Sequence, residues 1–256
     1  MADVFADQLR NRVVGEPEGV AVIDELGAVN NAELDSLTDA VAAEVRESGA
    51  TRVAIVASNS TRFLAHAFGI WRAGATLVTI YPSSPTSEIG YALTHSGVTL
   101  VFADDECAKR VPEGYDVRRI DRALAPRGAA ATVDIDPGAV ALICYTSGST
   151  QHPKAVMHSH ASLLGGARAY AQVWHLDAAD TTLVVLPMAW AFGLVTTSMA
   201  ALVSGGRVRS IRRAHPELLL RAVLESRVTF IAGVTTIYAK MVEALRSGSL
   251  IDGHAV

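Results

Sequence analysis

The sequence has few cysteines, few aromatic residues and no excess of basic charge. The two cysteines of its 256 residues, Cys107 and Cys144, lie too far apart in sequence for a disulfide framework and do not have metal-ligand spacing. Lys and Arg number 22 against 26 Asp and Glu, and the resulting charge of -4 excludes bulk attraction to nucleic acid or to an anionic membrane. The N-terminal stretch "MADVFADQLRNRVV" lacks the basic start and apolar block of a signal peptide. We therefore expect a cytoplasmic protein with no nucleic-acid partner.

Apolar residues are plentiful instead. They make up 50% of the chain, while charged residues make up 19%, which excludes a disordered or fibrous class and favours a sheet buried on both faces. The length allows either one large α/β unit or two fused halves.

One apolar run, from Leu183 to Val203, has 21 residues without a charge, which is long enough to cross a bilayer. Pro187 and Gly193 interrupt it, and no basic cluster flanks its start. We expect a core strand, a turn and a buried helix, with no stable membrane insertion.

Strand-like and helix-like patterns alternate along the first half of the chain. Strands are expected at 53–57, 76–80 and 99–103, and helices at 31–48, 61–74 and 86–97. This order predicts βαβ units and a parallel sheet with right-handed crossovers. Ligands of such sheets bind at the carboxyl ends of the strands.

Residues 104–138 break the rhythm with charges and three prolines, and we expect a surface connector there. Beyond it, strands are expected at 139–145, 181–186, 207–211 and 229–233, and helices at 159–174, 194–203, 215–225 and 235–245. The predicted fold class is α/β with parallel-rich sheets flanked by helices. A first subdomain with its connector is expected over 1–138, and a second, incomplete subdomain over 139–256.

The stretch "YTSGSTQHPKAVMHSH", residues 145–160, contains six hydroxyl-bearing residues, one glycine and one lysine, and it directly follows an apolar strand. Its backbone N–H groups around Gly148 and its hydroxyls form a set of donors suited to phosphate oxygens, and Lys154 adds a positive charge. It is not the common P-loop, because Pro153 precedes the lysine and Ala155 follows it. A solvated turn with Ser159 as an ordinary helix N-cap is the alternative interpretation.

This loop resembles the pattern Y-T-S-G-[ST]-T-G-x-P-K-G-V of the adenylate-forming (AMP-binding) superfamily, which includes acyl-CoA synthetases, aryl-acid ligases and peptide-synthetase adenylation domains. Three further segments resemble that family in the same order: "NAELDSL" through "LVTIYP" (31–82), "LPMAWAFGL" (186–194) and "TFIAGVTTIYAKM" (229–241). The resemblance covers nearly the whole chain. It implies the family's large N-terminal domain, in which helices flank two parallel-rich sheets.

The resemblance also implies a reaction. ATP and a carboxylic acid give an acyl-adenylate and pyrophosphate, and the acyl group then passes to a thiol such as coenzyme A (CoA). By position in the motif, the implied ATP contacts are Thr146, Ser147, Gly148, Ser149, Thr150, Gln151 and Lys154. Thr150 and Lys154 are the implied catalytic residues, and Thr150 would face the Mg²⁺ that accompanies ATP. The implied substrate pocket contains Trp190, Phe192, Gly193 and Gly233.

The chain departs from the family pattern at several positions. Gln151 and Ala155 replace glycines, which is costly wherever the backbone needs a positive φ. Trp190 replaces a histidine at the border of the acyl pocket and the thiol channel. Either it fills that space, so that the substrate is small or enters differently, or it is a core residue. His152, His158 and His160 are expected to be loop and helix-start residues rather than metal ligands.

Nothing in the sequence resembles the family's Y-G-x-T-E segment, its ribose-binding aspartate or its C-terminal-domain lysine. We therefore expect an N-terminal portion of a ligase whose missing C-terminal part acts in cis or in trans. Apolar surface that this part would cover predicts self-association. The alternative is a catalytically incompetent relic that binds a nucleotide or a partner protein.

Overall fold

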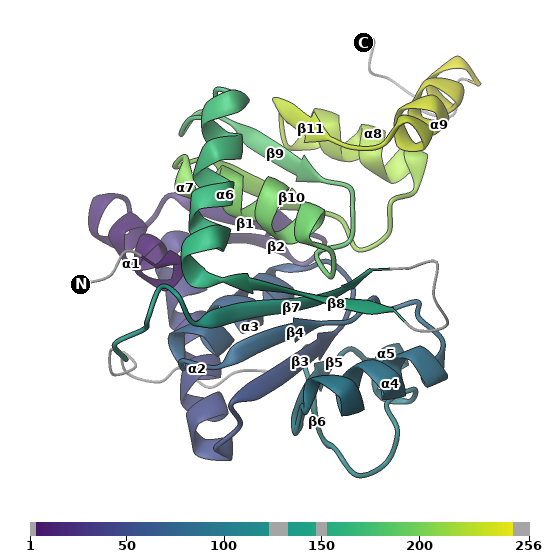
Figure 1. Cartoon of the computed structure of the whole chain (residues 1–256). Helices are drawn as coiled ribbons and strands as arrows, with labels where there is room; N and C mark the ends of the chain where they lie inside the picture. Colours follow the sequence, from purple (N-terminus) through teal and green to yellow (C-terminus); the bar gives the residue numbers. More distant parts are fainter. Residues whose placement is uncertain (1–3, 123–132, 147–152, 248–256) are drawn as a thin grey trace.

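Two β-sheets with helices on and between them form the molecule (Figure 1). The computed structural model describes residues 4–122, 133–146 and 153–247. One sheet has six strands in the order β6-β5-β3-β4-β7-β8, and the other has five in the order β11-β9-β10-β1-β2. Most neighbouring strands run parallel, so the predicted α/β class with parallel-rich sheets is confirmed.

The inner strands of the six-stranded sheet are buried on both faces, while its edge strands β6 and β8 are partly exposed. Its strands are β3 (Arg52–Val56), β4 (Thr76–Thr79), β5 (Leu100–Ala103), β6 (Asp116–Arg119), β7 (Val140–Thr146) and β8 (Lys154–Ser159). Within β3, Val53 and Ile55 face one apolar core, while Ala54 and Val56 face another. Successive side chains of a strand point to opposite faces, so a strand with helices on both sides is apolar throughout.

The five-stranded sheet combines the two halves of the chain. Its strands are β1 (Val20–Asp24), β2 (Gly27–Asn30), β9 (Thr181–Val184), β10 (Arg207–Ser210) and β11 (Phe230–Ala232). Because β1 pairs with β10, and β4 in the other sheet pairs with β7, both sheets take strands from each side of residue 138. The expected division into subdomains at that residue therefore does not coincide with the division into sheets.

The helices cover the sheets and fill the space between them. They are α1 (Phe5–Gly15), α2 (Asn31–Ser48), α3 (Thr61–Arg72), α4 (Thr86–Ser96), α5 (Asp105–Ala108), α6 (His160–Val173), η1 (Phe192–Met199), α7 (Ala200–Val203), α8 (Pro216–Glu225) and α9 (Thr235–Arg246). Those predicted from periodicity are present to within a few residues. The helix α1, the β1–β2 hairpin, the short α5 and the strand β6 were not predicted, and the last two lie inside the expected connector.

Local sequence explains the ends and the packing of α2. Asn30 and Glu33 form a reciprocal capping box at its start, and Gly49 ends it with a φ of 69°. Against α3 it packs so closely that a Cβ on Gly69 would lie 2.5 Å from Cβ of Val41. Glycine is required there because two helix backbones approach each other.

The apolar run 183–203 forms a strand end, a turn and a buried helix, as expected, but the helix begins as a π-helix, η1. The Ser198 hydroxyl donates to the Gly193 carbonyl at 2.7 Å. A Cβ on Gly193 would lie 2.2 Å from the carbonyl oxygen of Pro187, so the start of η1 is pressed onto the preceding turn. Among the helices in the described ranges, none is long and apolar enough to span a membrane.

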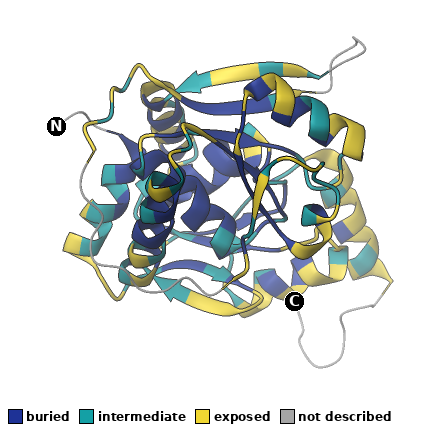
Figure 2. Ribbon diagram, turned by 90° about the horizontal axis from the view of Figure 1, so that it is seen from below, coloured by how far each residue is buried: buried dark blue, intermediate teal, exposed yellow. Residues whose placement is uncertain are grey.

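A single apolar core joins the two sheets. It includes Val22 and Val208 of the five-stranded sheet, Ile55 and Leu142 of the six-stranded sheet, and Phe68 of α3 between them. Figure 2 shows this pattern as buried ribbon at the centre and exposed ribbon at the rim. Close packing of this kind holds the carboxyl ends of both sheets in a fixed relation.

The prediction of one open loop from the end of β7 to α6 was wrong in its second half. Residues Lys154–Ser159 form β8, which pairs antiparallel with β7 from Val140 to Thr146. An unpaired β7 would leave a row of backbone N–H and C=O groups exposed, and β8 satisfies them. The helix α6 then begins at His160, and the Ser159 hydroxyl caps it by accepting from Ser162 N, which is the part given to Ser159 in the alternative interpretation of this loop.

Candidate active site

The two ends of the hydroxyl-rich segment lie on the paired strands β7 and β8. Thr146 ends β7 and Lys154 begins β8, and their Cα atoms are partners in the hairpin register. Both side chains are exposed, and the Thr146 hydroxyl reaches the Lys154 carbonyl at 3.5 Å. Ser147, Gly148, Ser149, Thr150 and Gln151 lie outside the described residues. The structure therefore brings the first and last predicted contacts together, and their roles stay a prediction.

The end of β7 is fixed to α4 by Tyr145. Its hydroxyl donates to the Ala92 carbonyl at 3.0 Å and lies 3.1 Å from Nδ1 of His95, which stacks on Tyr91. Burial raises the pKa of Tyr145, so the hydroxyl keeps its proton and stays a donor. Ala155 pairs with Tyr145 in extended conformation, so no positive φ is needed there and its Cβ carries no backbone cost, contrary to expectation.

A cavity of about 480 Å³ lies between this hairpin and α4, and we call it the hairpin cavity. Thr146 and Pro153 line it from the hairpin, and Ser84 and Glu88 from the start of α4. Its wall is otherwise mostly apolar and aromatic: Ile80, Tyr81, Ala92, Cys144, Tyr145, Trp190 and Ala191. A largely apolar space beside a polar loop suits a small organic ligand with one charged end.

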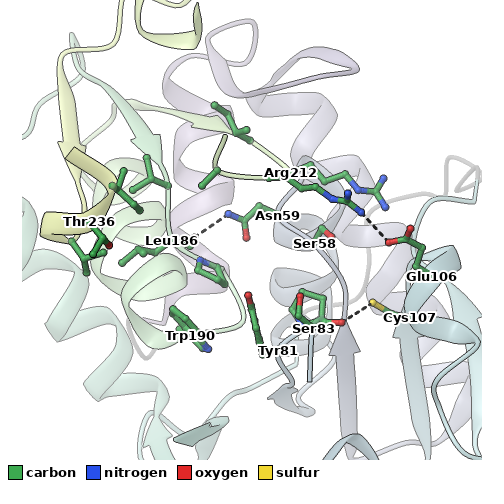
Figure 3. A pocket seen from close by; sticks show the side chains of 18 of the residues that line it. Ser58, Asn59, Tyr81, Ser83, Glu106, Cys107, Leu186, Trp190, Arg212 and Thr236 are labelled. Carbon is green, nitrogen blue, oxygen red and sulfur yellow. Dashed lines mark hydrogen bonds and ion pairs between the residues drawn. The ribbon is translucent and has the colours of Figure 1, made fainter. Parts of the chain in front are cut away.

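A second cavity, of about 510 Å³, lies where the carboxyl ends of both sheets meet, and we call it the seam cavity (Figure 3). The segments after β3, β4 and β5 line it from the six-stranded sheet, and those after β9, β10 and β11 line it from the five-stranded sheet. Parallel sheets bind ligands at this end, as the sequence predicted.

Three arginines and two acids shape the rim of the seam cavity. Arg212 lies 3.4 Å from Asp104, and Arg213 lies 3.1 Å from Glu106, so both pairs join the two sheets. The side chains of Arg212 and Arg213 are 52% and 75% exposed. Arg110 donates to the carbonyls of the turn after β4. The Arg213–Glu106 pair is exposed on both sides and therefore weak, whereas Arg212 is half exposed and pairs with the buried Asp104 carboxylate.

Buried groups beneath the rim hold fixed protonation states. Burial raises the pKa of Asp104, but the hydrogen bonds that its carboxylate accepts from Cys107 and Ser58 outweigh burial and leave the pKa below its usual value. Burial and the nearby Asp104 carboxylate raise the pKa of Cys107 to about 12. The thiol therefore stays protonated near neutral pH and is not a nucleophile.

Trp190 and Tyr81 separate the two cavities, since both side chains line each of them. Their ring centroids are 5.1 Å apart with planes at 33°, and Figure 3 shows the rings side by side. The indole is 41% exposed. Trp190 is thus a wall residue rather than a core residue, and its role toward a substrate stays a prediction.

The other predicted pocket residues lie near this wall but do not line either cavity. Phe192 is the first residue of η1 and is 37% exposed, while Gly193 is buried against the turn before it. Gly233 precedes Val234, which lines the seam cavity, and a Cβ on Gly233 would meet the Val185 side chain at 3.2 Å. Their role in substrate binding stays a prediction.

Of the three histidines in this segment, His160 serves the fold, and His152 lies outside the described residues. His160 is buried beside Trp71 at the start of α6, and burial lowers its pKa. In the part of the chain that the structure describes, no group of three or more His, Cys, Asp or Glu side chains could hold a metal ion.

Sequence reasoning missed several residues that line the cavities, above all Asn59, Tyr81 and Arg212. Each lies within two residues of the end of a strand that was predicted, and polar or aromatic residues at such positions are the signal that was available.

Comparisons with known proteins agree with the resemblance. Residues 9–252 match the family model described as AMP-binding enzyme. A feruloyl-CoA synthase of Amycolatopsis sp is 29% identical over 232 residues, which cover 87% of this chain and 47% of that enzyme. Syringomycin synthase SyrB1 of Pseudomonas syringae pv. syringae is 28% identical over 259 residues, covering 96% of this chain and 41% of that protein. The chain thus spans less than half of these curated relatives.

Solved structures show the same fold. The apo structure of MbtA from Mycobacterium smegmatis has a TM-score of 0.86 and 26% identity, over 95% of this chain and 50% of that one. The structure of VinN has a TM-score of 0.85 and 23% identity, over 96% of this chain and 65% of that one.

Proposed function

The chain belongs to the family of AMP-binding enzymes, and we propose that it is part of a ligase that activates a carboxylic acid with ATP and passes the acyl group to CoA. Its relatives include both CoA ligases and peptide synthetases. Activation of an acid is shared by both groups, so the choice of CoA as the acceptor is the more specific part of the proposal.

The hairpin tip is the proposed ATP site. Thr146, Ser147, Gly148, Ser149, Thr150, Gln151 and Lys154 would hold the phosphates by hydroxyl, backbone, amide and ammonium donors. Lys154 at the start of β8 and Thr146 at the end of β7 support this, because both are exposed at the mouth of the hairpin cavity or beside it. Mg²⁺ would supply charge neutralisation together with ATP, and Thr150 is the residue proposed to face it.

The two cavities suit the acid and the thiol acceptor. The hairpin cavity is next to the proposed phosphate site and mostly apolar, so it is the proposed place for the acyl group. The seam cavity lies on the other side of Trp190, so a thiol bound there would meet the activated carbonyl at this wall. The aromatic wall favours a small acid.

One observation carries the choice of CoA: Arg212 and Arg213 sit exposed at the rim of the seam cavity. CoA bears a diphosphate and a 3′-phosphate, whereas the arm of a carrier protein bears a single phosphodiester. Guanidinium groups bind phosphates in bidentate geometry, and two of them exceed what one phosphodiester needs.

Calorimetric titration with CoA, dephospho-CoA and pantetheine tests the acceptor. We expect affinity to fall in that order, and Arg212→Ala and Arg213→Ala each to weaken CoA binding roughly 10–100-fold, the value of a charge-assisted hydrogen bond. Arg221→Ala, an exposed arginine on α8, is the matched control. Equal binding of CoA and pantetheine would exclude phosphate recognition at this rim.

Pyrophosphate exchange with ATP over a panel of small acids tests the activation step. Because the chain spans less than half of its curated relatives, we propose that the remaining residues are needed for turnover, and the assay includes the downstream region of a relative supplied in cis or in trans.

A non-catalytic protein that binds a nucleotide or a partner is the second candidate, favoured by Trp190 where the family has histidine. Binding of an ATP analogue without any exchange would support it. Self-association stays a prediction as well: Tyr238, Val242 and Leu245 are exposed along α9, and size-exclusion chromatography tests whether they mediate it.

A further inference from the structure

The turn between β3 and α3 connects the two sheets through its side chains and backbone. The backbone N–H and the hydroxyl of Ser58 donate to the Asp104 carboxylate, which follows β5, at 3.1 and 3.2 Å. The backbone N–H of Thr61 donates at 2.9 Å to Asp24 at the end of β1. The turn is therefore bonded to the ends of strands from both sheets, and Asn59 lies in its middle.

The side chain of Asn59 grips the turn that follows β9. Its amide nitrogen donates to the Leu186 carbonyl at 2.9 Å, and its amide oxygen accepts from the Met188 N–H at 2.7 Å. The two contacts lie on either side of Pro187, and Asn59 itself is only 7% exposed. Figure 3 shows Asn59 pointing toward Leu186 across the cavity wall. A two-point contact fixes both the position and the orientation of this turn.

Backbone hydrogen bonds connect this turn to Trp190. The Trp190 N–H donates to the Pro187 carbonyl at 3.0 Å, and the Trp190 carbonyl accepts from Leu194 N at the same distance. Gly193 is pressed onto the same Pro187 carbonyl. The backbone of Trp190 is thus held between the gripped turn and the start of η1, and its ring lies on Tyr81.

We propose that Asn59 is a positioning residue that holds the indole of Trp190 in place on the wall between the two cavities. The inference rests on the proposed function for what the cavities bind, whereas the contact and its effect on Trp190 are properties of the fold. Without the amide, the turn loses its hydrogen bonds on both sides of Pro187. The indole of Trp190 then moves away from Tyr81, and the two cavities merge.

Two variants and one matched control separate positioning from a loss of stability. Asn59→Ala removes both hydrogen bonds, while Asn59→Asp keeps an acceptor for Met188 N–H and places an oxygen against the Leu186 carbonyl. The control is Asn31→Ala, because Asn31 is also buried and also makes two bonds, accepting from Arg12 Nε and donating to the Glu16 carbonyl, both at 2.7 Å. These bonds lie at the start of α2, and Asn31, Arg12 and Glu16 do not line either cavity.

The main readout is quenching of tryptophan fluorescence by acrylamide, which needs no ligand. The chain has three tryptophans, and subtracting a matched Trp190→Phe variant in each background isolates Trp190. We expect Asn59→Ala to raise the quenching constant of Trp190 by up to about twofold, because a half-exposed ring becomes free, and Asn59→Asp to raise it less. Asn31→Ala should leave it unchanged. Unchanged quenching in both Asn59 variants, or an equal rise in Asn31→Ala, overturns the inference.

A titration with CoA gives a second readout. We expect weaker CoA binding in Asn59→Ala but not in Asn31→Ala. If the unsubstituted chain does not bind CoA, the proposed acceptor is wrong while the quenching result still decides the role of Asn59. If Asn59→Ala does not fold, Asn59→Asp carries the quenching test.

Discussion

The indole Nε1 of Trp71 in α3 donates a hydrogen bond of 2.8 Å to the carbonyl oxygen of Ala141 in β7, 70 residues further along the chain. The register between β7 and β8 shifts at this point, between Val140 and Leu142, so Ala141 has no partner in β8. The fully buried indole thus ties α3 to the irregular start of the strand that carries the proposed phosphate site.

Trp71→Phe should destabilise the fold by about 2–4 kcal/mol, because it leaves a buried carbonyl without its donor and a cavity where the larger ring was. Urea unfolding measures it. Trp174→Phe is the control and should cost less, since Trp174 is only half-buried. Equal losses in the two variants would contradict the importance of the hydrogen bond.

Gly69→Ala should destabilise by about 1–3 kcal/mol, because the new methyl group would lie 2.5 Å from Cβ of Val41 and 2.9 Å from the Thr38 carbonyl oxygen. Gly165 offers a matched helical control, since a Cβ there meets nothing within 4 Å. Gly165→Ala should therefore stabilise by about 0.5–1 kcal/mol. The same urea experiment compares both, and a neutral Gly69→Ala would show that α2 and α3 can separate at no cost.

Because His66 is buried, we expect the free energy of unfolding to fall in mild acid. Burial lowers the pKa of His66 from 6.5 to about 3, so the folded chain stays neutral at this site while the unfolded chain takes up a proton below pH 6.5. The contribution of neutral His66 to the free energy of unfolding is fully present above pH 6.5. It is lost as the pH falls toward 3, by up to about 1.4 kcal/mol per pH unit.

Unfolding free energies at about pH 7.5 and about pH 5 test this, with His66→Leu as the comparison. The substitution should flatten the pH dependence over this interval. An identical slope in both proteins would assign the acid sensitivity to other groups.

Lys154→Ala should weaken binding of a non-hydrolysable ATP analogue roughly 10–100-fold, if its ammonium meets a phosphate as proposed. Lys240 on α9 is a suitable control, because it is equally exposed and far along the chain from the hairpin. Calorimetry measures both variants. Equal affinities would remove Lys154 from the proposed ATP site.

Most of the six-stranded sheet was predictable because its elements are long and regular. The helical spacing of α2 and the apolar runs of β3, β4 and β5 are local signals, and each was confirmed. The β1–β2 hairpin was missed because its strands have only five and four residues, and their partner β10 lies far along the chain. The strand β8 was missed because its side chains are mostly exposed and a proline precedes it.

The candidate site was predictable only where a local sequence motif contains its residues. Thr146 and Lys154 were placed in one loop by the motif, and hairpin pairing brings them together. Asn59, Tyr81 and Arg212 meet at the seam cavity only through packing of the two sheets, which no local pattern encodes. The π-helical start of η1 depends on the close approach of Gly193 to Pro187, a contact that composition alone does not indicate.

The mixed origin of the five-stranded sheet has a consequence for biosynthesis. The strand β1 ends at Asp24, but its parallel neighbour β10 begins at Arg207, so at translation rates of about 5–20 residues per second the early hairpin waits roughly 10–40 s for its partner. During that delay the backbone N–H and C=O groups on this edge of β1 stay unpaired on the nascent polypeptide, and the edge is open to pairing with another chain until β10 arrives.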